Sequence, residues 1–472
     1  MQFIYCPMTI WTPDISTTEG PKYLAIANAI AGAISDGDLL PGEKLPPQRN
    51  LAYDLGVTLG TITRAYQEAT RRGYVDGEVG RGTFVLDPLH ATSPAGSFMT
   101  NIQSEEAGLD FSHATPAIGY AGECLRATLQ DLCASGNLDA LTDYQRNTGH
   151  PDHLAAGAKW VSSFGLSAPV EQIAITNGAQ QGVFLSFMTV ARPGELILTE
   201  ALTYPGIVHL ANQMGYRLQG IAMDDDGIRP DILEDICRRE SPKALYVMPT
   251  LHNPTTTTMS AERRIAVAEI ARKYGIYIIE DDIWGSLADH PPRPLSSYAP
   301  ELSFYVSGLS KGMAGGLRVG YVLAPKSRAP NLRGMVRLNN WMTAPLMAEI
   351  ARRWINDGTG HEIIKWQREQ ARLRTGIALD ILKGYSVRSD CAAFHVWLEL
   401  PQPWRGDAFR MEAERQGVFL ASGEAFVVGR EAAPHALRIC TGGNKSIADV
   451  KRGIEIVASI LNARPDSGFA LV

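Results

Sequence analysis

The chain has 472 residues, more than one hydrophobic core of ordinary size accommodates, so two or three domains are expected. Its composition is that of a globular soluble protein, and its net charge of -6 gives no general attraction to a polyanion. Six scattered cysteines without a Cys-x-x-Cys pair argue against a zinc site and against a disulfide framework. The N-terminus lacks the features of a secretory signal, and no apolar run is long enough to span a bilayer, so a cytoplasmic protein is expected.

Apolar residues at helical spacing predict a helix over residues 22–36. Two shorter helices are expected near 48–55 and over 60–72, the second of them capped by Thr58. Alternating residues on either side of a Gly-rich tip at 77–82 predict a β-hairpin. Three helices followed by such a wing make a winged helix-turn-helix.

The segment 88–108 is rich in Pro, Ser, Thr, Ala and Gly without periodicity, which predicts a linker. Beyond it, strand-like runs alternate with helical segments, a pattern typical of an α/β fold with a mostly parallel sheet. These runs are 172–175, 196–198, 244–248 and 276–279. The expected domains are the winged helix-turn-helix at 1–87, a large α/β domain at 109–350 and a smaller C-terminal α+β domain at 351–472.

Lys311 lies in a turn of small residues after the strand-like run 304–306, and Arg318 follows it seven positions later. A desolvated lysine amine forms a Schiff base with an aldehyde cofactor, and a guanidinium binds phosphate bidentately. The layout therefore favours a site for a phosphorylated aldehyde cofactor. Taken alone, the Ser-Lys pair is better explained as a surface lysine in a Gly-rich loop, and it is the surrounding motifs that favour the cofactor.

The segments Leu39–Arg49, Thr61–Tyr66 and Gly80–Phe84 resemble the winged-helix domain of the GntR family. The resemblance implies binding of double-stranded operator DNA, with arginines on phosphates and base edges and the wing in the minor groove. The residues expected at the DNA are Arg49, Thr58, Thr61, Thr63, Arg64, Gly80, Arg81 and Gly82.

The charge of this N-terminal module is -3, from seven Lys/Arg and ten Asp/Glu in residues 1–87. Attraction to DNA is therefore expected from a local basic stripe that includes Arg71 and Arg72. The alternative for these two arginines is a solvated face that pairs with the helix dipole. Leu59 stands where the family often has arginine, so the family's base contacts do not transfer directly.

Five separated segments follow one another along the chain: Thr176–Gln181, Glu200–Gly206, Pro249–Thr255, Ile278–Gly285 and Lys311–Arg318. In this order they resemble the class I/II group of fold-type I aminotransferases, which use pyridoxal phosphate. The resemblance implies that Lys311 holds the cofactor, that Asp281 pairs with the pyridine nitrogen, and that Arg438 grips the α-carboxylate of a bound amino acid. The other implied cofactor residues are Asn253 on the phenolic oxygen, Tyr204 stacked on the ring, Gly178, Ala179, Gln180, Ser310 and Arg318 near the phosphate, and Tyr144 reaching across a homodimer interface.

Two positions depart from the aminotransferase pattern. Trp284 replaces a tyrosine that bonds the phenolic oxygen, and an indole cannot ionise near neutral pH. Gly308 replaces a hydroxyl residue that binds phosphate, for which Ser307 or Ser310 is the expected substitute. Both changes leave cofactor binding intact as an expectation and argue against fast transamination.

The combination of the two modules resembles the MocR subgroup of GntR-type bacterial regulators. It implies a homodimeric regulator in which an amine or amino-acid effector displaces Lys311 to form an external aldimine and alters operator binding. Two alternatives stay open: a working aminotransferase with a secondary DNA module, and a regulator that senses the cofactor itself.

Overall fold

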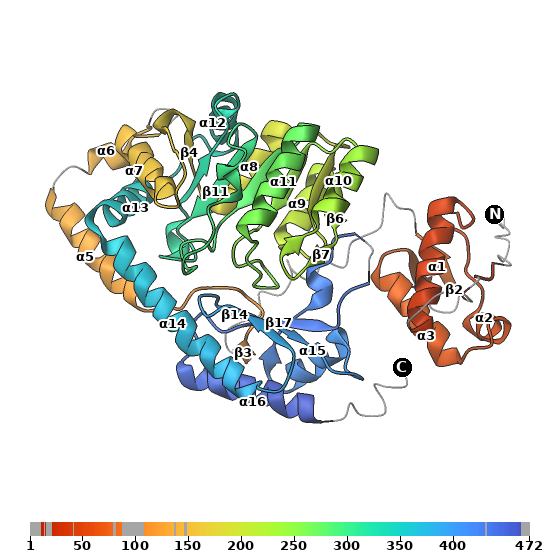
Figure 1. Ribbon diagram of the computed structural model, residues 1–472. Helices are drawn as coiled ribbons and strands as arrows, with labels where there is room; N and C mark the ends of the chain where they lie inside the picture. The colour runs from red at the N-terminus through yellow and green to blue at the C-terminus, as the bar shows by residue number, and fades with distance from the viewer. Residues whose placement is uncertain are drawn as a thin grey trace, which may run out of the picture. The chain divides into compact units, whose positions relative to one another are not determined.

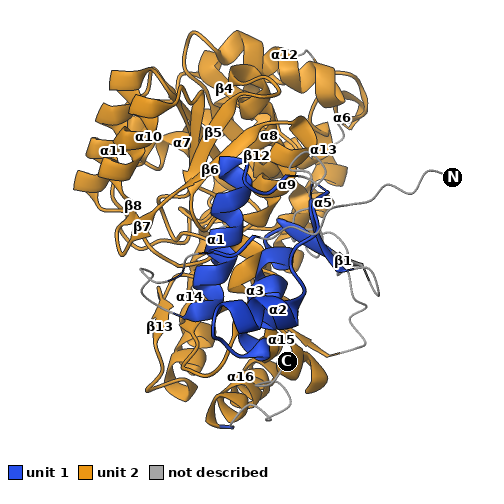
Figure 2. Ribbon diagram, turned by 90° about the vertical axis from the view of Figure 1, so that its right-hand side faces the viewer, with its two compact units in different colours: residues 1–104, 429–434, 463–472 blue, residues 105–428, 435–462 orange. Residues whose placement is uncertain are grey.

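The computed structural model describes residues 11–13, 15, 21–40, 42–78, 82–86, 108–135, 138–145, 149–429 and 432–463. The chain forms two compact units, coloured separately in Figure 2. The first comprises residues 1–104, 429–434 and 463–472, and the second comprises 105–428 and 435–462. The expected DNA-binding residues Gly80 and Arg81, and the expected linker except for Gly108, lie outside the described residues.

The first unit contains the three helices and the hairpin that the sequence predicts (Figure 1). Their bounds are α1 Lys22–Asp36, α2 Gln48–Asp54, α3 Leu59–Arg71, and the antiparallel strands β1 Val75–Glu78 and β2 Gly82–Val85. The predicted cap of the third helix is confirmed, because the Thr58 hydroxyl accepts a hydrogen bond from the Thr61 amide at 3.2 Å. Gly37 ends α1 with a φ of +83°, which favours glycine.

The core of this unit forms where the apolar stripe of α1 meets α3. Ile26, Ile30 and Ile62 are fully buried there. Burial of each such side chain contributes roughly 1.5–3 kcal/mol. The three-helix arrangement therefore follows from the apolar spacing of these helices.

The interpretation of Arg72 as part of a DNA-facing stripe, or as part of a solvated face, is wrong. Its side chain is buried and donates hydrogen bonds to Glu68 at 2.7 Å and to Asn28 at 2.6 Å. Burial alone would raise the pKa of Glu68, but hydrogen bonds and charge from Arg71 and Arg72 outweigh it and lower this pKa to about 2. The pair of arginines ties α3 internally and to α1 instead of offering two free cations to DNA.

The second unit is built on a seven-stranded sheet of order β4-β12-β11-β10-β9-β5-β6 (Figure 1). The strands are β4 Ile173–Thr176, β5 Leu196–Glu200, β6 Arg217–Ile221, β9 Ala244–Val247, β10 Tyr277–Asp281, β11 Ser303–Gly308 and β12 Gly320–Leu323. Only β12 runs antiparallel to its two neighbours, so the predicted mostly parallel sheet is confirmed.

Helices cover both faces of this sheet. On one face, Val183 of α8 packs with Tyr246, Ile279 and Val306, while on the other face Trp160 of α7 packs with Tyr305. The remaining elements around the sheet are β3 Leu109–Asp110, α5 Tyr120–Ser135, α6 Asp139–Thr142, α7 Pro151–Ser162, α8 Ala179–Val190, α9 Pro205–Met214, β7 Met223–Asp224, β8 Gly227–Ile228, α10 Pro230–Arg239, α11 Ala261–Tyr274, α12 Ala329–Asn340 and α13 Pro345–Asp357. Burial on both faces explains why these strands read as continuous apolar runs.

A smaller sheet of order β13-β14-β17-β16 follows in the C-terminal part. Its strands and helices are α14 Thr359–Ile381, β13 Val387–Ser389, β14 His395–Glu399, α15 Gly406–Arg415, β15 Val418–Phe419, β16 Ala421–Ser422, β17 Ala436–Cys440 and α16 Ile447–Asn462. Strand β15 pairs with β3, which returns the chain to the start of this unit. Across the ranges that the structure describes, no helix has the length and apolar character needed to cross a membrane.

Candidate cofactor and effector site

The turn from β4 into α8 forms one end of a cavity of about 370 Å³. Gly178, with a φ of +82°, precedes the first residue of α8, and a Cβ added there would lie 2.6 Å from an Arg318 guanidinium nitrogen. Arg318 donates to the Asn177 carbonyl at 3.3 Å. Glycine therefore allows a guanidinium to approach a helix N-terminus, a combination that suits a phosphate.

The same cavity brings together four residues that the sequence assigned to the cofactor: Gln180, Tyr204, Asp281 and Arg318. They come from the starts of α8 and α9, the end of β10, and the turn before β12. Gly206 also lines the cavity, and a Cβ there would lie 2.3 Å from the Tyr204 ring. The cavity thus has a cationic end at Arg318 and a carboxylate at Asp281.

Asp281 ends β10 and is buried. Its carboxylate accepts a hydrogen bond from the Tyr246 hydroxyl at 2.8 Å and a longer one from the Ile283 amide at 3.3 Å. Burial raises its pKa to about 6, although these hydrogen bonds and the charge of Lys311 pull in the other direction. A buried carboxylate with neutral donors is suited to a cationic ring nitrogen. Tyr246, which the sequence reasoning missed, is one of those donors.

Lys311 follows β11, and its amine donates to the Ala114 carbonyl at 2.5 Å. The amine lies 5.0 Å from the centre of the Trp284 ring. Burial lowers the pKa of Lys311 to about 8, and the positive charges of Arg438 and Arg318 act in the same direction. A lysine with this pKa has a larger neutral, nucleophilic fraction near neutral pH than an exposed one.

Arg438 lies on β17 and is buried. It donates to the Asn253 side-chain oxygen at 2.7 Å and to the Ser112 carbonyl, and its guanidinium carbon is 4.7 Å from the Phe426 ring centre. Its Nε has no hydrogen-bond partner among the residues that the structure describes. Because Arg438 occupies the oxygen of Asn253, the amide nitrogen of Asn253 is left to donate. A phenolic oxygen is a suitable acceptor for it.

The two departures from the aminotransferase pattern have visible packing reasons. Trp284 is fully buried, with its ring centre 5.5 Å from that of His395, which sequence reasoning also missed. At Gly308 an added Cβ would lie 3.0 Å from Ile283, which leaves little space for a hydroxyl residue. Of the two expected substitutes, Ser307 is buried and accepts a hydrogen bond from Trp160 at 3.1 Å, and the assignment of Ser310 stays a prediction.

Tyr144 does not line the cavity of its own chain. It is 77% exposed, and its ring meets the Trp341 ring edge-on at 6.1 Å. Its assignment to the cofactor of a second subunit stays a prediction, as do the roles of the other assigned residues.

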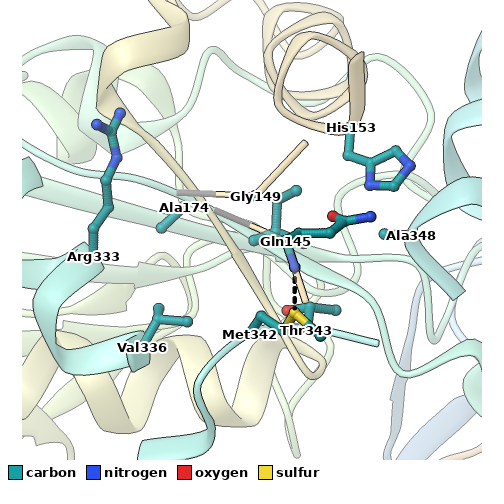
Figure 3. A pocket seen from close by; sticks show the side chains of 10 residues that line it. Gln145, Gly149, His153, Ala174, Arg333, Val336, Met342, Thr343 and Ala348 are labelled. Atoms are coloured by element: carbon teal, nitrogen blue, oxygen red, sulfur yellow. Dashed lines mark hydrogen bonds between the residues drawn. The ribbon is translucent and has the colours of Figure 1, made fainter. Parts of the chain in front are cut away.

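A second cavity near Gly149, shown in Figure 3, has a volume of only about 20 Å³. It lies between α7, β4, α12 and α13, where the backbone amide of Gln145 donates to the Met342 sulfur at 3.2 Å. It has space for about one water molecule, and none of the assigned cofactor residues lines it.

The expected DNA-binding residues lie on the first unit. Arg49 is exposed at the start of α2, and Arg64 is half-buried on α3. Thr63 donates to Gln48 at 2.8 Å, which fixes α3 against α2. Gly82 has a φ of +120°, and a Cβ there would collide with the Lys44 side chain. These residues keep their DNA assignment as a prediction.

Comparison with known proteins gives two family matches. Residues 22–85 match bacterial regulatory proteins of the gntR family, and residues 120–457 match aminotransferase class I and II. The chain belongs to the aminotransferase class I and II family and carries a GntR-type helix-turn-helix domain at its N-terminus, the MocR architecture.

The similar proteins include named transcriptional regulators and aminotransferases of known structure. The uncharacterized HTH-type transcriptional regulator YdeF of Bacillus subtilis is 31% identical over 97% of each chain. The pyridoxine biosynthesis regulator PdxR of Corynebacterium glutamicum is 27% identical over 66% of this chain and 68% of its own length. Among solved structures, the kynurenine aminotransferase of Pyrococcus horikoshii covers 76% of this chain and 91% of its own, with a TM-score of 0.70 at 22% identity. That likeness establishes the fold.

Proposed function

We propose that the chain is a pyridoxal-phosphate-dependent transcription regulator, whose operator binding responds to an amine or amino acid bound at Lys311. The observation that carries the proposal is the cavity lined by Asp281 and Arg318, together with the buried Lys311, whose pKa the charges of both residues influence. These groups lie in the second unit of a chain whose first unit is a GntR-type helix-turn-helix. When bound, pyridoxal phosphate supplies an aldehyde that condenses with amines and a ring that accepts electrons.

The residues present fit such a group. The glycine at 178 leaves space for Arg318 at the N-terminus of α8, so a phosphate meets a guanidinium and backbone amides. Asp281 would hold a proton at the ring nitrogen, and Tyr246 orients its carboxylate. The amide nitrogen of Asn253 remains available for the phenolic oxygen, since Arg438 binds its oxygen.

An effector with an amine would compete with the amine of Lys311 for the aldehyde. Arg438 would bind the α-carboxylate of an amino acid, a planar group that matches its guanidinium, whose Nε has no hydrogen-bond partner among the described residues. The amine of Lys311 lies 5.0 Å from the centre of the Trp284 ring, at the position where the family has a tyrosine. Without a phenol to bond the phenolic oxygen, the site would hold the cofactor less rigidly than an efficient enzyme does.

Peptide mapping after borohydride reduction tests the cofactor assignment directly. The expected result is a phosphopyridoxyl mass on the peptide that contains Lys311 and none in Lys311→Ala. Label on another lysine, or none after incubation with pyridoxal phosphate, contradicts the proposal.

The second candidate is an active aminotransferase. It is less favoured, because the relatives that align over most of the chain are named as regulators and because Trp284 and Gly308 depart from the enzyme pattern. Steady-state turnover with a panel of amino acids and 2-oxoglutarate distinguishes the two. Rates far below the enzyme median of about 10 per second are expected.

A further inference from the structure

A cavity of about 520 Å³ lies beside the ends of α7 and α13 and the start of α14. None of the residues that line it also lines the cavity at Asp281 and Arg318. Its volume is in the range of small-molecule sites, roughly 300–1,000 Å³. The proposed function does not use it.

One wall of this cavity is aromatic. Trp160, Phe164 and Trp354 contribute to it, and Phe164 meets the Trp160 ring edge-on at 5.1 Å. Both indole nitrogens donate to side chains outside the lining, Trp160 to Ser307 at 3.1 Å and Trp354 to Thr128 at 2.8 Å. The indoles therefore present carbon surface to the cavity, which favours a ligand with an apolar, aromatic body.

Three cationic side chains line the same cavity: Lys159, Arg293 and Arg368. Lys159 donates to the amide oxygen of Asn356 at 3.1 Å, and Arg293 donates to the Gly165 carbonyl at 3.0 Å. These acceptors are neutral, so they leave the positive charges uncancelled.

Arg368 lies deeper than the other two cations. Its guanidinium donates to two backbone carbonyls, those of Ser286 at 2.9 Å and Ala288 at 3.0 Å. Its Nε is buried without a hydrogen-bond partner among the described residues. A buried donor without a partner is costly, so the described part of the protein leaves some hydrogen-bonding capacity of this guanidinium unused.

The carboxylates of the lining do not balance these cations. Asp289 binds Arg372, which is not part of the lining, and is 3.9 Å from Arg368. Asp282 is buried, accepts a hydrogen bond from Tyr305 at 2.5 Å, and has its pKa raised by burial. The cavity therefore favours an anion.

We propose that this cavity is a second small-molecule site, specific for an aromatic carboxylate, with the ring against Trp160, Phe164 and Trp354 and the carboxylate toward Arg368. Lys159 and Arg293 are exposed, so they strengthen the attraction for the anion from the rim. Binding at this site does not involve the amine of Lys311, because the ligand carries no amine that would compete with it.

The test is calorimetric titration of the cofactor-loaded, full-length protein with 3-phenylpropionate, which has no amine to react at Lys311. One molecule is expected to bind per chain, and the uncharged analogue 3-phenylpropan-1-ol is expected to bind at least about tenfold more weakly, since a charged hydrogen-bonded contact is lost. Arg368→Gln should weaken the binding of 3-phenylpropionate by a similar factor. The matched control Arg217→Gln, at an exposed arginine of β6, should leave its affinity unchanged.

The variant Arg438→Gln distinguishes the cavity at Arg368 from the effector site at Arg438. It should not change the affinity for 3-phenylpropionate. Binding that is lost in Arg438→Gln and kept in Arg368→Gln would assign the probe to the effector site and overturn the proposal. If Arg368→Gln fails to fold, the rim variant Lys159→Gln/Arg293→Gln replaces it, with a severalfold loss expected. No binding at millimolar concentration, or equal binding of the alcohol, also overturns the proposal.

Discussion

Replacing Asp281 by asparagine should stabilise the protein without cofactor and abolish its ability to hold the cofactor. The ionised carboxylate is costly in the empty site, because burial raises its pKa from 3.8 to about 6. When folding raises the pKa of a carboxyl group, the folded protein loses stability as the pH rises from the lower to the higher of these two values. This difference in pKa corresponds to a loss of about 3 kcal/mol in the free energy of unfolding, and the loss is complete at pH 7 and above.

Asparagine is isosteric and uncharged, so it removes that cost. It keeps an oxygen for the Tyr246 hydroxyl, but its NH2 group would face the Ile283 amide and lose the 3.3 Å hydrogen bond, at about 1 kcal/mol. The net gain expected for the Asp281→Asn protein without cofactor is therefore about 2 kcal/mol at pH 8. At pH 5 the gain should fall to roughly 0.5 kcal/mol, because this pH lies between the two pKa values and only about half of the cost of the carboxylate is then expressed.

Urea unfolding of the cofactor-free protein at pH 5 and pH 8 measures both values. Asp380→Asn is the control, since Asp380 is exposed on α14 and its substitution should change stability by less than about 0.5 kcal/mol at either pH. Pyridoxal phosphate should stabilise the original protein and not the Asp281→Asn variant. A variant that is less stable at pH 8, or equally affected at both pH values, would refute the reasoning about this carboxylate.

Three further predictions concern operator binding, the response to amino acids and the oligomeric state. Arg64→Ala should weaken operator binding, by on the order of 1–3 kcal/mol if the arginine pairs with guanine and by less if it contacts only phosphate. A gel-shift titration measures the operator affinity. An unchanged affinity, or loss of the visible cofactor band in this variant, contradicts the prediction. Arg438→Ala should abolish the spectral response to amino acids while the visible cofactor band persists, and a full response to alanine in the variant contradicts the assignment. Sedimentation should show a homodimer, and a monomer at micromolar concentration with cofactor bound argues against the shared role of Tyr144.

Much of the fold was predictable because local patterns and burial agree. The spacing of Ile26, Ile30 and Ile34 predicts α1, and the apolar runs that end at Thr176 and Asp281 predict central strands. Asp281 stood out since a charged residue at the end of a buried strand needs a partner, whereas Lys311 stood out only together with the motifs around it.

Other features depend on contacts between residues far apart in the chain. Arg72 is buried because it reaches Asn28, which no pattern near residue 72 indicates. Tyr246 meets Asp281 because β9 and β10 are neighbours in the sheet, and the sequence of β9 reads only as an apolar strand. The Ala114 carbonyl that binds Lys311 belongs to a loop with no motif. Such partners follow from the three-dimensional arrangement alone.

The most direct test of the central claim is operator affinity measured with and without an amino-acid effector, in the original protein and in Lys311→Ala. The account predicts that an amino acid which shifts the cofactor band also changes operator affinity in the original protein, with a coupling of typically 1–3 kcal/mol. In Lys311→Ala the protein should still bind the operator, with an affinity that no amino acid changes. An unchanged operator affinity in the original protein at effector concentrations that saturate the spectral shift would contradict the account.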